Sequence, residues 1–312
     1  MSTTDRNHGV RFETVGTDHG GQRLDNWLTS RLKGVPRSLV YRLIRTGQVR
    51  IDGKRAKAAT RLEVGDTVRI PPVRVAERSP GEVPDRAVSE LRDRVLFTNE
   101  DLLVMDKPSG MAVHSGSGLS WGLIDVVRKL YPDEFVELVH RLDRETSGCL
   151  VIARNGNALN HLSALFREGD MDKRYLCLLH GSLEADRVDV DAPLARVEGK
   201  DNRRIVVVSN QGKKALTRFR RLQAWPGISY AEAELLSGRT HQIRAHARHI
   251  GAPVAGDARY SERESQKYWR ERGLKRLFLH AHSIGFKAPD GSRVDVHAPL
   301  PEDLRAVLDG LD

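Results

Sequence analysis

One short segment of the chain gathers the side chains that could carry out a reaction. In LVHRLDRETSGCLVIA, residues 138–153, an aspartate at position 143 lies between two arginines and precedes a turn-forming Thr-Ser-Gly and an apolar run. A carboxylate on a loop that leads into a buried strand is held by a rigid scaffold, as a reactive group requires, and nearby guanidinium groups favour its ionised form. Asp143 is therefore a candidate catalytic carboxylate. A structural ion pair at a strand edge is the alternative.

The sequence lacks the motifs that bind common cofactors and metals. It contains no G-x-x-x-x-G-K-[ST] phosphate loop and no H-E-x-x-H zinc motif, and the glycines of GSGLSWG (116–122) do not have the spacing of a dinucleotide-binding loop. His241, His246 and His249 fall on one predicted helix, without a cysteine pair or an acidic third ligand to complete a zinc site. We therefore expect no metal and no cofactor, and chemistry that runs on side chains alone.

Positive charge is concentrated near the N-terminus. The 312 residues include 51 Lys and Arg against 42 Asp and Glu, a net charge of +9, and residues 11–75 alone hold 14 basic and 6 acidic residues, a net +8. A basic cluster confined to one short segment is typical of nucleic-acid binding. We expect a polyanionic partner for this segment. Charge that serves only solubility is the alternative.

Length and composition exclude several classes of protein. No window approaches the ~18 apolar residues of a membrane-spanning helix, and the polar start, MSTTDRNHGVRFE, has no apolar region typical of secretory signals. Two cysteines, Cys149 and Cys177, are too few for a disulfide framework. The sequence predicts a cytoplasmic protein without membrane contact. Nothing in it indicates an obligate dimer, so we expect a monomer.

The basic segment has the pattern of a small folded domain. Residues 23–34 and 36–49 predict two helices with apolar residues at helical spacing, and residues 49–56 predict a hairpin that turns at an Asp-Gly pair. A second short strand pair is expected around residues 65–66. This arrangement resembles the S4 RNA-binding domain. The resemblance implies that five basic side chains contact RNA phosphates, namely Arg37, Arg42, Arg45, Lys54 and Lys57. A solvated basic face is the alternative.

Composition shifts divide the chain into parts. Residues 77–90 (ERSPGEVPDRAVSE) combine prolines and alternating charges with few apolar residues, which predicts a linker. The chain beyond it is long enough for one enzyme-sized core. We predict a flexible tail over 1–17, an S4-like domain over 18–76, a linker over 77–90 and a catalytic domain over 91–312.

Strand-like runs dominate the predicted catalytic domain. Helices are expected between some of them, at 121–131, 157–168, 240–250 and 301–309. They are too few and too irregular for the βαβ repeat of a doubly wound sheet. We expect an α+β fold, with a mixed, largely antiparallel sheet and flanking helices, behind the small N-terminal α/β domain.

Four motifs of this domain resemble, in the same order, those of the RluA-type pseudouridine synthases. The string H-R-L-D-x-x-T-S-G-x-L at 140–150 is similar to the signature of that family. LVMDKPSGMAVHSGSG (103–118), KRYLCLLHG (173–181) and LLSGRTHQIRAHARHIGAPVAGDARY (235–260) resemble its other motifs. No motif position departs from the family pattern. With an S4-like domain in front, the arrangement is similar to the subgroup that modifies ribosomal RNA.

The resemblance implies an isomerase that acts on uridines of large-subunit (23S) ribosomal RNA. Such an enzyme breaks the N1–C1′ bond of a uridine, turns the base and rejoins it through C5, without a cofactor. Asp143 matches the catalytic aspartate, which either attacks C1′ or takes a proton from C2′. Tyr175 matches a tyrosine that packs against the uracil ring and assists deprotonation at C5, and Arg239 matches an arginine that pairs with the aspartate.

Two further basic residues are implicated by the same resemblance. Arg141 matches the residue that fills the space left by the flipped base, and Lys107 of the K-P-S-G motif is expected to contact the RNA backbone. For Tyr175 the alternative is a core tyrosine, for Arg239 a phosphate-binding arginine at a helix start, and for Lys107 a structural role.

Other functions stay open on the sequence alone. A non-catalytic RNA-binding or ribosome-assembly protein would use the basic domain and keep the larger one as scaffold. A hydrolase of N-glycosidic bonds would use an aspartate similarly but release the base. A synthase of the same family that acts on another RNA, such as tRNA, would carry the same motifs.

Overall fold

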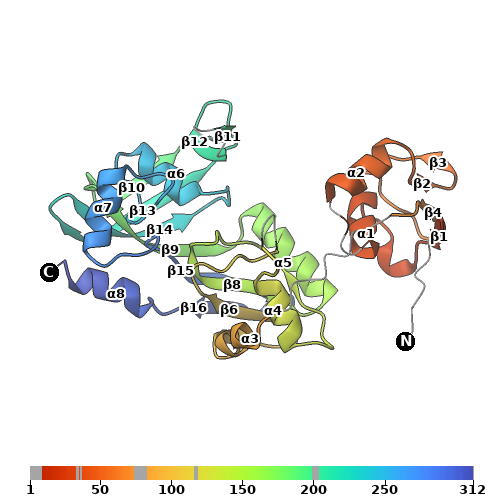
Figure 1. Ribbon diagram of the computed structural model, residues 1–312, viewed down its shortest axis with the longest axis horizontal. Coiled ribbons are helices and arrows are strands. Elements are labelled where there is room, and N and C mark those ends of the chain that lie inside the picture. The colour runs from red at the N-terminus through yellow and green to blue at the C-terminus, as the bar shows by residue number, and fades with distance from the viewer. Residues whose placement is uncertain are drawn as a thin grey trace. The chain divides into compact units, whose positions relative to one another are not determined.

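The computed structural model describes residues 9–32, 35, 37–73, 83–115, 119–198 and 204–311. The chain divides into two compact units, residues 1–81 and 82–312, which are drawn in Figure 1 and described separately below. Among the described residues, no helix is both long and apolar enough to cross a bilayer.

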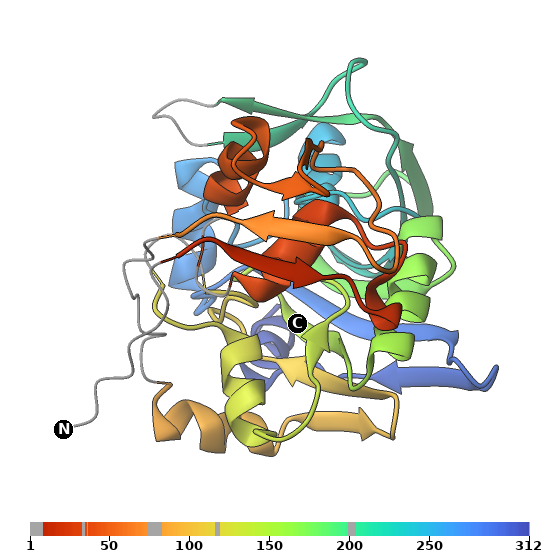
Figure 2. The same ribbon diagram turned by 90° about the vertical axis from the view of Figure 1, so that its right-hand side faces the viewer.

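The first unit packs two helices against a small sheet (Figure 2). Its core is formed by apolar residues of both helices at helical spacing, among them Trp27, Leu28, Val40 and Ile44. The strands pair in the order β1-β4-β2-β3. The elements are β1 (Arg11–Thr14), the 3-10 helix η1 (Thr17–His19), α1 (Leu24–Arg31), α2 (Arg37–Arg45), β2 (Arg50–Ile51), β3 (Lys54–Arg55) and β4 (Thr67–Ile70).

The predicted hairpin is present, because β2 and β3 are joined by Asp52 and Gly53. Both residues have positive φ, 47° and 75°, as a two-residue hairpin turn requires. The second predicted strand pair, around residues 65–66, is wrong. There β4 pairs with β1 and β2, so its partners come from elsewhere in the unit rather than from the segment directly before it.

The prediction of a flexible tail over 1–17 is wrong for its second half. Residues 11–14 form β1, which pairs along its whole length with β4. The next residue, Val15, is 1 % exposed and anchors this edge strand in the core. The polar side chains of β1 gave no apolar alternation to predict it, because an edge strand is stabilised largely by its backbone hydrogen bonds. Residues 1–8 lie outside the described part of the chain.

The predicted linker over 77–90 is wrong at its C-terminal end. Helix α3 (Asp85–Arg92) begins directly after Pro84 and buries Ala87 and Leu91 in a core shared with α4 (Leu123–Leu130). The Lys129 ammonium of α4 donates to the Val83 carbonyl oxygen and to a carboxylate oxygen of Asp85, each at 2.8 Å. Two apolar residues at i and i+4 were enough to hold a short helix because a partner helix covers them. Residues 74–82 lie outside the described part.

The second unit is built on a ten-stranded sheet, with the main order β10-β13-β14-β9-β15-β8-β6-β5. Strand β16 pairs with β15 and β7 pairs with β8. Among the described strands only the β8–β15 pair is parallel, so the predicted mixed, largely antiparallel α+β fold is confirmed. The strands are β5 (Val95–Thr98), β6 (Leu102–Lys107), β7 (Glu137–Leu138), β8 (Ser147–Ala153), β9 (Asp172–His180), β10 (Arg187–Asp191), β13 (Leu216–Trp225), β14 (Ile228–Leu235), β15 (Leu279–Lys287) and β16 (Arg293–His297).

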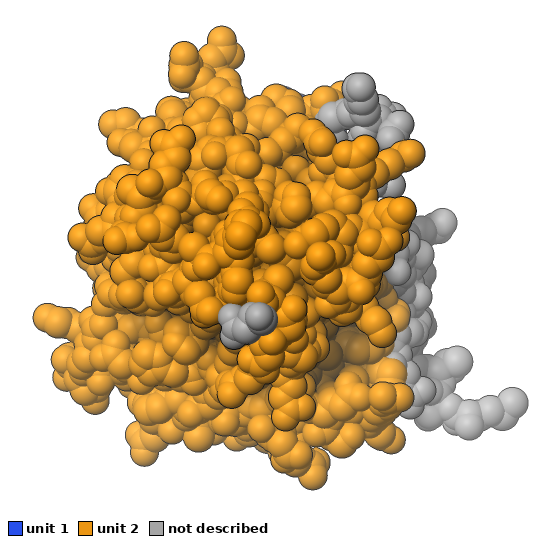
Figure 3. All heavy atoms as spheres, turned by 90° about the vertical axis from the view of Figure 1, so that its left-hand side faces the viewer, with its two compact units in different colours: residues 1–81 blue, residues 82–312 orange. Residues whose placement is uncertain are grey.

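Strand alternation distributes the core over both faces of this sheet. In β6, Leu103 and Met105 pack with α3 and α4, whereas Leu102 and Val104 pack on the opposite face with α5 (Gly156–Glu168). The other half of the sheet carries α6 (Gln242–His249), α7 (Arg263–Glu271) and α8 (Glu302–Asp309). Figure 3 shows one face of this unit with its heavy atoms as spheres. The sequence predicted α4, α5, α6 and α8 but not α3 or α7.

A two-stranded ribbon, β11 (Leu194–Glu198) and β12 (Arg204–Val208), stands apart from the large sheet. It packs on α6 through Leu194 and Val206, which share a small core with Ala245 and Tyr260. The ribbon therefore adjoins the helix that begins at the G-R-T-H-Q-I-R motif.

Candidate active site

The predicted catalytic residues gather at one cleft of about 790 Å³ in the second unit. Its lining includes Asp143, Tyr175, Arg239 and Arg141, which the sequence placed in three separate motifs. The walls come from the 140–143 loop, the end of α5, β9, the loop after β14 and the start of α6. Four of the five residues predicted near the reaction therefore share one cavity.

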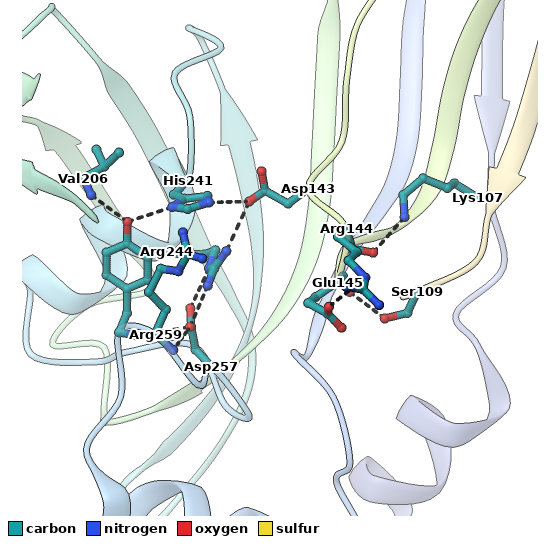
Figure 4. Close-up of polar contacts among 11 residues, drawn as sticks. Lys107, Ser109, Asp143, Arg144, Glu145, Val206, His241, Arg244, Asp257 and Arg259 are labelled. Carbon is teal, nitrogen blue, oxygen red and sulfur yellow. Dashed lines mark hydrogen bonds and ion pairs between the residues drawn. The ribbon is translucent and has the colours of Figure 1, made fainter. Parts of the chain in front are cut away.

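The Asp143 carboxylate projects from its loop toward helix α6 (Figure 4). The loop turns sharply, because the Thr146 amide donates to the Asp143 carbonyl oxygen at 3.1 Å before β8 begins. The side chain of Asp143 is 21 % exposed, so it is accessible to a ligand in the cleft while its loop is fixed at one end by the sheet.

Arg244 is the guanidinium that contacts Asp143. Its Nη1 lies 3.3 Å from Asp143 Oδ2. Its Nε and Nη2 donate to both carboxylate oxygens of the fully buried Asp257, at 2.6 and 2.7 Å. This bidentate contact fixes the guanidinium plane, so that the remaining nitrogen faces Asp143 and stabilises a negative charge there.

The predicted pairing of Arg239 with Asp143 is therefore wrong. Arg239 lines the cleft, but its Nε donates to the Lys214 carbonyl oxygen at 3.1 Å. Its backbone amide is held by the Gln242 side chain, which anchors the loop ahead of α6. The motif G-R-T-H-Q-I-R contains two arginines, and only the one inside the helix, Arg244, turns toward the aspartate.

His241 is the second neighbour of Asp143, with Nε2 3.7 Å from Oδ2. It is the N-cap residue of α6 and has a left-handed backbone conformation, φ 53°, which is uncommon outside glycine. Because His241 precedes Arg244 by three residues, the two side chains lie on the same side of the helix. Burial is the main cause that lowers the pKa of His241 to about 4, which outweighs the opposing effect of Asp143. The ring is therefore neutral at pH 7.

A hydrogen-bond chain sets the orientation of the His241 ring. The Tyr260 hydroxyl accepts the Val206 amide of β12 at 2.9 Å and lies 2.9 Å from His241 Nδ1. When this hydroxyl donates to Nδ1, the single proton of the neutral imidazole stands on Nε2, the nitrogen that faces Asp143. The carboxylate is thus flanked by a guanidinium and by an imidazole N–H. The sequence indicated neither of these partners.

Lys107 does not line the cleft, contrary to the predicted RNA contact. Its side chain is 0 % exposed, and its ammonium donates to the carbonyl oxygens of Pro108, Met111 and Arg144 at 2.7–3.0 Å. Burial lowers the pKa of Lys107 to about 7. A long side chain that satisfies three backbone acceptors ties the K-P-S-G loop to the loop of Asp143, so its role is structural (Figure 4).

Tyr175 lies on β9 with its ring between two hydrophobic cores and at the cleft wall. Burial, followed by the nearby Asp143 charge, raises the pKa of Tyr175 well above its usual value. The phenol is therefore protonated at neutral pH and presents an aromatic surface beside the carboxylate.

Three of the five basic residues predicted in the first unit line a groove of about 760 Å³ there. Arg42, Arg45 and Lys57 line it together with Arg55, which the sequence analysis did not single out. Lys54 is exposed on β3 but is not part of this lining. The side chain of Arg37 lies outside the described part of the structure.

These features limit what the large cleft can do. A partly exposed carboxylate is flanked by a buried guanidinium and faces an aromatic ring. Among the described residues no group of three or more His, Cys, Asp and Glu side chains is placed to hold a metal ion. A carboxylate in this setting can stabilise positive charge, attack an electrophilic carbon or take a proton.

Comparisons with known proteins identify the family of both units. Residues 101–249 match the model of the RNA pseudouridylate synthase family and residues 22–68 match that of the S4 domain. The chain is 43 % identical over 309 residues to the ribosomal large subunit pseudouridine synthase C of Pasteurella multocida, covering 98 % of this chain and 95 % of the relative. The Escherichia coli protein of the same name is 44 % identical over 308 residues, with 97 % of each chain covered.

Solved structures agree with this assignment. The human RNA pseudouridylate synthase domain containing 1 superposes with a TM-score of 0.59 at 28 % identity, over 70 % of this chain and 88 % of that one. The human RNA pseudouridylate synthase domain containing 4 shares the fold, with a TM-score of 0.60 at 23 % identity over 73 % and 96 % of the two chains.

Proposed function

Because the chain belongs to the RNA pseudouridylate synthase family, we propose that it isomerises specific uridines of large-subunit ribosomal RNA to pseudouridine, with Asp143 as the catalytic carboxylate. Relatives that match almost the whole chain bear the name of a ribosomal large subunit synthase. The observation that carries the proposal is the position of Asp143, partly exposed in the cleft and held by Arg244.

The geometry accounts for the chemistry in three steps. Breaking the N1–C1′ bond builds positive charge on the ribose, which a fixed carboxylate stabilises. Arg244 keeps Asp143 oriented, because its other two nitrogens are bound to Asp257. The freed uracil turns within the cleft, C5 bonds to C1′, the proton on C5 is lost, and N1 takes up a proton. The product has the same atoms as the substrate, so the reaction consumes no co-substrate.

Two residues of the cleft act on the substrate nucleotide in this proposal. Tyr175 supplies the ring against which the uracil packs, since it lies at the cleft wall beside Asp143. Arg141 is exposed at the cleft edge and fills the space from which the base has left the RNA stack. The groove of the S4 domain contributes phosphate contacts elsewhere on the RNA.

We further propose that the enzyme works as a cytoplasmic monomer without a cofactor. The sequence carries no cofactor-binding motif, and nothing in it indicates an obligate dimer. A mixture of monomer and dimer in sedimentation at assay concentrations, with activity only in the dimer, would contradict this part of the proposal.

The experiment that tests the proposed function is a map of pseudouridines in ribosomal RNA from cells with and without the protein. We expect discrete sites in large-subunit RNA to lose their pseudouridine signal and to regain it when the gene is restored. An unchanged large-subunit map would contradict the proposal. Sites lost only in tRNA would indicate the alternative RNA substrate, and free uracil with abasic RNA in the purified reaction would indicate a hydrolase.

A further inference from the structure

Lys173 is a basic side chain of the cleft that the proposed chemistry does not use. Lys173 precedes Tyr175 by two residues on β9, so strand alternation places both side chains on one face, about 7 Å apart along the strand. Both line the cleft. Lys173 is only 6 % exposed, yet among the described residues its ammonium has no hydrogen bond and no ion pair.

Among the described residues Lys173 has no ion-pair partner, although the Asp172 charge acts on it. Its Nζ lies 5.9 Å from the centre of the Phe166 ring. The nearest carboxylate in sequence, Asp172, is exposed and pairs with Arg293 at 2.5 Å. Partial burial of the ammonium has a desolvation cost, and it lowers the pKa of Lys173. An anion that enters the cleft would offset this cost.

His140 adds a second hydrogen-bond donor near Lys173. His140 also lines the cleft, and its Nε2 accepts the Val151 amide at 2.9 Å. The proton of the neutral ring therefore stands on Nδ1, and burial, then the Lys173 charge, lowers the pKa of His140 to about 3. The His140 ring stacks on Phe166 at 4.3 Å. The Lys173 ammonium and the His140 ring thus both lie near the Phe166 ring.

Arg167 adds an exposed positive charge at the same wall. It lines the cleft at the end of α5 and is 70 % exposed, with one 3.5 Å contact to the exposed Glu168. An exposed pair of this kind is weak, so the guanidinium is available to an incoming anion. Three donors with at most a weak internal partner are typical of a site for a phosphate.

We propose that Lys173 binds a phosphate of the nucleotide whose uracil packs on Tyr175. The inference rests on the proposed function, which brings an RNA nucleotide into this cleft. A base held at Tyr175 leaves its sugar and phosphate to extend along the wall, and Lys173 lies one side-chain repeat away on the same strand face. Lys173 thereby helps to position the ribose over Asp143 and acts as a positioning residue.

The test compares Lys173→Met with the wild-type enzyme and with Lys275→Met, a control in an exposed lysine outside the cleft. The probe is a synthetic RNA stem-loop centred on a uridine that the wild-type enzyme modifies in a large-subunit transcript. We expect Lys173→Met to weaken binding about tenfold and to reduce the slope of log Kd against log salt by about 0.7, whereas the control matches wild type.

Chemical replacement of the phosphate identifies the contact. Neutral methylphosphonates are placed separately on the 5′ and the 3′ side of the target nucleotide. At one of these positions the wild-type enzyme and Lys173→Met should bind equally, because the charge that Lys173 contacts is gone. Unequal binding at both positions, or equal binding to the unmodified RNA, would overturn the proposal.

Stability distinguishes this role from a structural one. Methionine fills nearly the same volume without a charge, so Lys173→Met should unfold at the same temperature as wild type or above it. A large fall in melting temperature with unchanged RNA binding would overturn the proposal. A failed proposed function gives a different result, because the wild-type enzyme itself would then release no tritium from RNA labelled at uridine C5.

Discussion

Arg244 links two carboxylates of different character. Asp257 is fully buried and receives two guanidinium nitrogens, while Asp143 is partly exposed and receives the third. The buried pair sets the plane of the guanidinium, and the exposed carboxylate is oriented by it. Arg239 of the same motif, which the sequence analysis paired with Asp143, takes no part in this contact because its Nε is bound to the Lys214 carbonyl oxygen.

Replacing these two arginines by lysine should separate their roles. Lysine retains the charge but cannot make the bidentate contact, so Arg244→Lys should lower kcat on the order of tenfold to a hundredfold. Arg239→Lys should stay within about threefold of wild type, because no planar fork contact is lost. Single-turnover rates on a ribosomal RNA transcript measure both. A larger loss in Arg239→Lys than in Arg244→Lys would reverse the assignment.

The sequence located the cleft residues better than their partners. Asp143 and Tyr175 stand out because each lies in a distinctive motif next to a buried strand. The sequence could not show whether Arg239, His241 or Arg244 of this basic motif contacts Asp143, because the answer depends on where the helix starts. It starts after His241, whose positive φ no apolar pattern indicates. Lys107 is a charged residue in a loop motif, which led to the prediction of an RNA contact. Its burial, which the sequence does not indicate, shows that its role is structural.

At the scale of elements, the parallel contact between β8 and β15 supports the strand that follows the loop of Asp143. His280 of β15 pairs in register with Ser147, and Ala281 pairs with Gly148. The Ser147 hydroxyl lies 2.9 Å from His280 Nδ1, and His280 Nε2 lies 3.2 Å from the Ala298 carbonyl oxygen. These contacts hold the first residues of β8, which directly follow the loop of Asp143.

Gly148 cannot be replaced without moving a strand. Its φ is 108°, and a Cβ there would lie 2.2 Å from the Ala281 carbonyl oxygen. Gly148→Ala should therefore lower the free energy of unfolding by about 2–5 kcal/mol. Gly156→Ala is the control, since Gly156 opens α5 with nothing near its Cβ, and should change stability by at most about 1 kcal/mol. Urea unfolding compares them. Equal stability of the two variants would contradict the proposed strand contact.

His280 should make the fold sensitive to acid. Burial lowers its folded pKa to about 4, whereas an unfolded histidine titrates near 6.5. As pH falls below about 6.5 the unfolded chain binds the proton first, so this part of the stability is complete above that pH and is lost toward pH 4. Between pH 7 and 5 the wild type should lose about 2 kcal/mol more than His280→Asn. Parallel pH profiles from urea unfolding would contradict the assignment.

Elements with a strong apolar period were predictable and those without one were not. The helices α4 and α5 and the strands β6 and β8 bury continuous or regularly spaced apolar residues. By contrast β1 is an edge strand of mostly exposed residues, and α7 buries only Ser265 and Trp269. Their stability comes from contacts with distant parts of the chain, which local periodicity does not encode.

At the scale of the whole molecule, RNA-binding charge and catalysis belong to separate units. The net charge of residues 11–75 is +8 of the total +9, and the groove of the first unit gathers Arg42, Arg45, Arg55 and Lys57. The cleft with Asp143 lies in the second unit. Affinity for RNA and the rate of the chemical step should therefore respond to different substitutions.

The triple variant Arg42→Gln, Arg45→Gln, Lys57→Gln tests this separation. Loss of about three phosphate contacts should lower the slope of log Kd against log salt by about 2 on a large-subunit transcript, with the single-turnover rate at saturation unchanged. Arg86→Gln, an exposed residue paired with Glu90, serves as the charge control. An unchanged salt slope in the triple variant would contradict the role of the groove.

The most direct test of the account is tritium release from RNA labelled at uridine C5 by Asp143→Asn. The substitution removes the carboxylate charge from the cleft but leaves the Arg244–Asp257 pair intact. We predict a rate at least about a thousandfold below wild type, with RNA affinity within about threefold. Activity within about tenfold of wild type would contradict the assignment of Asp143.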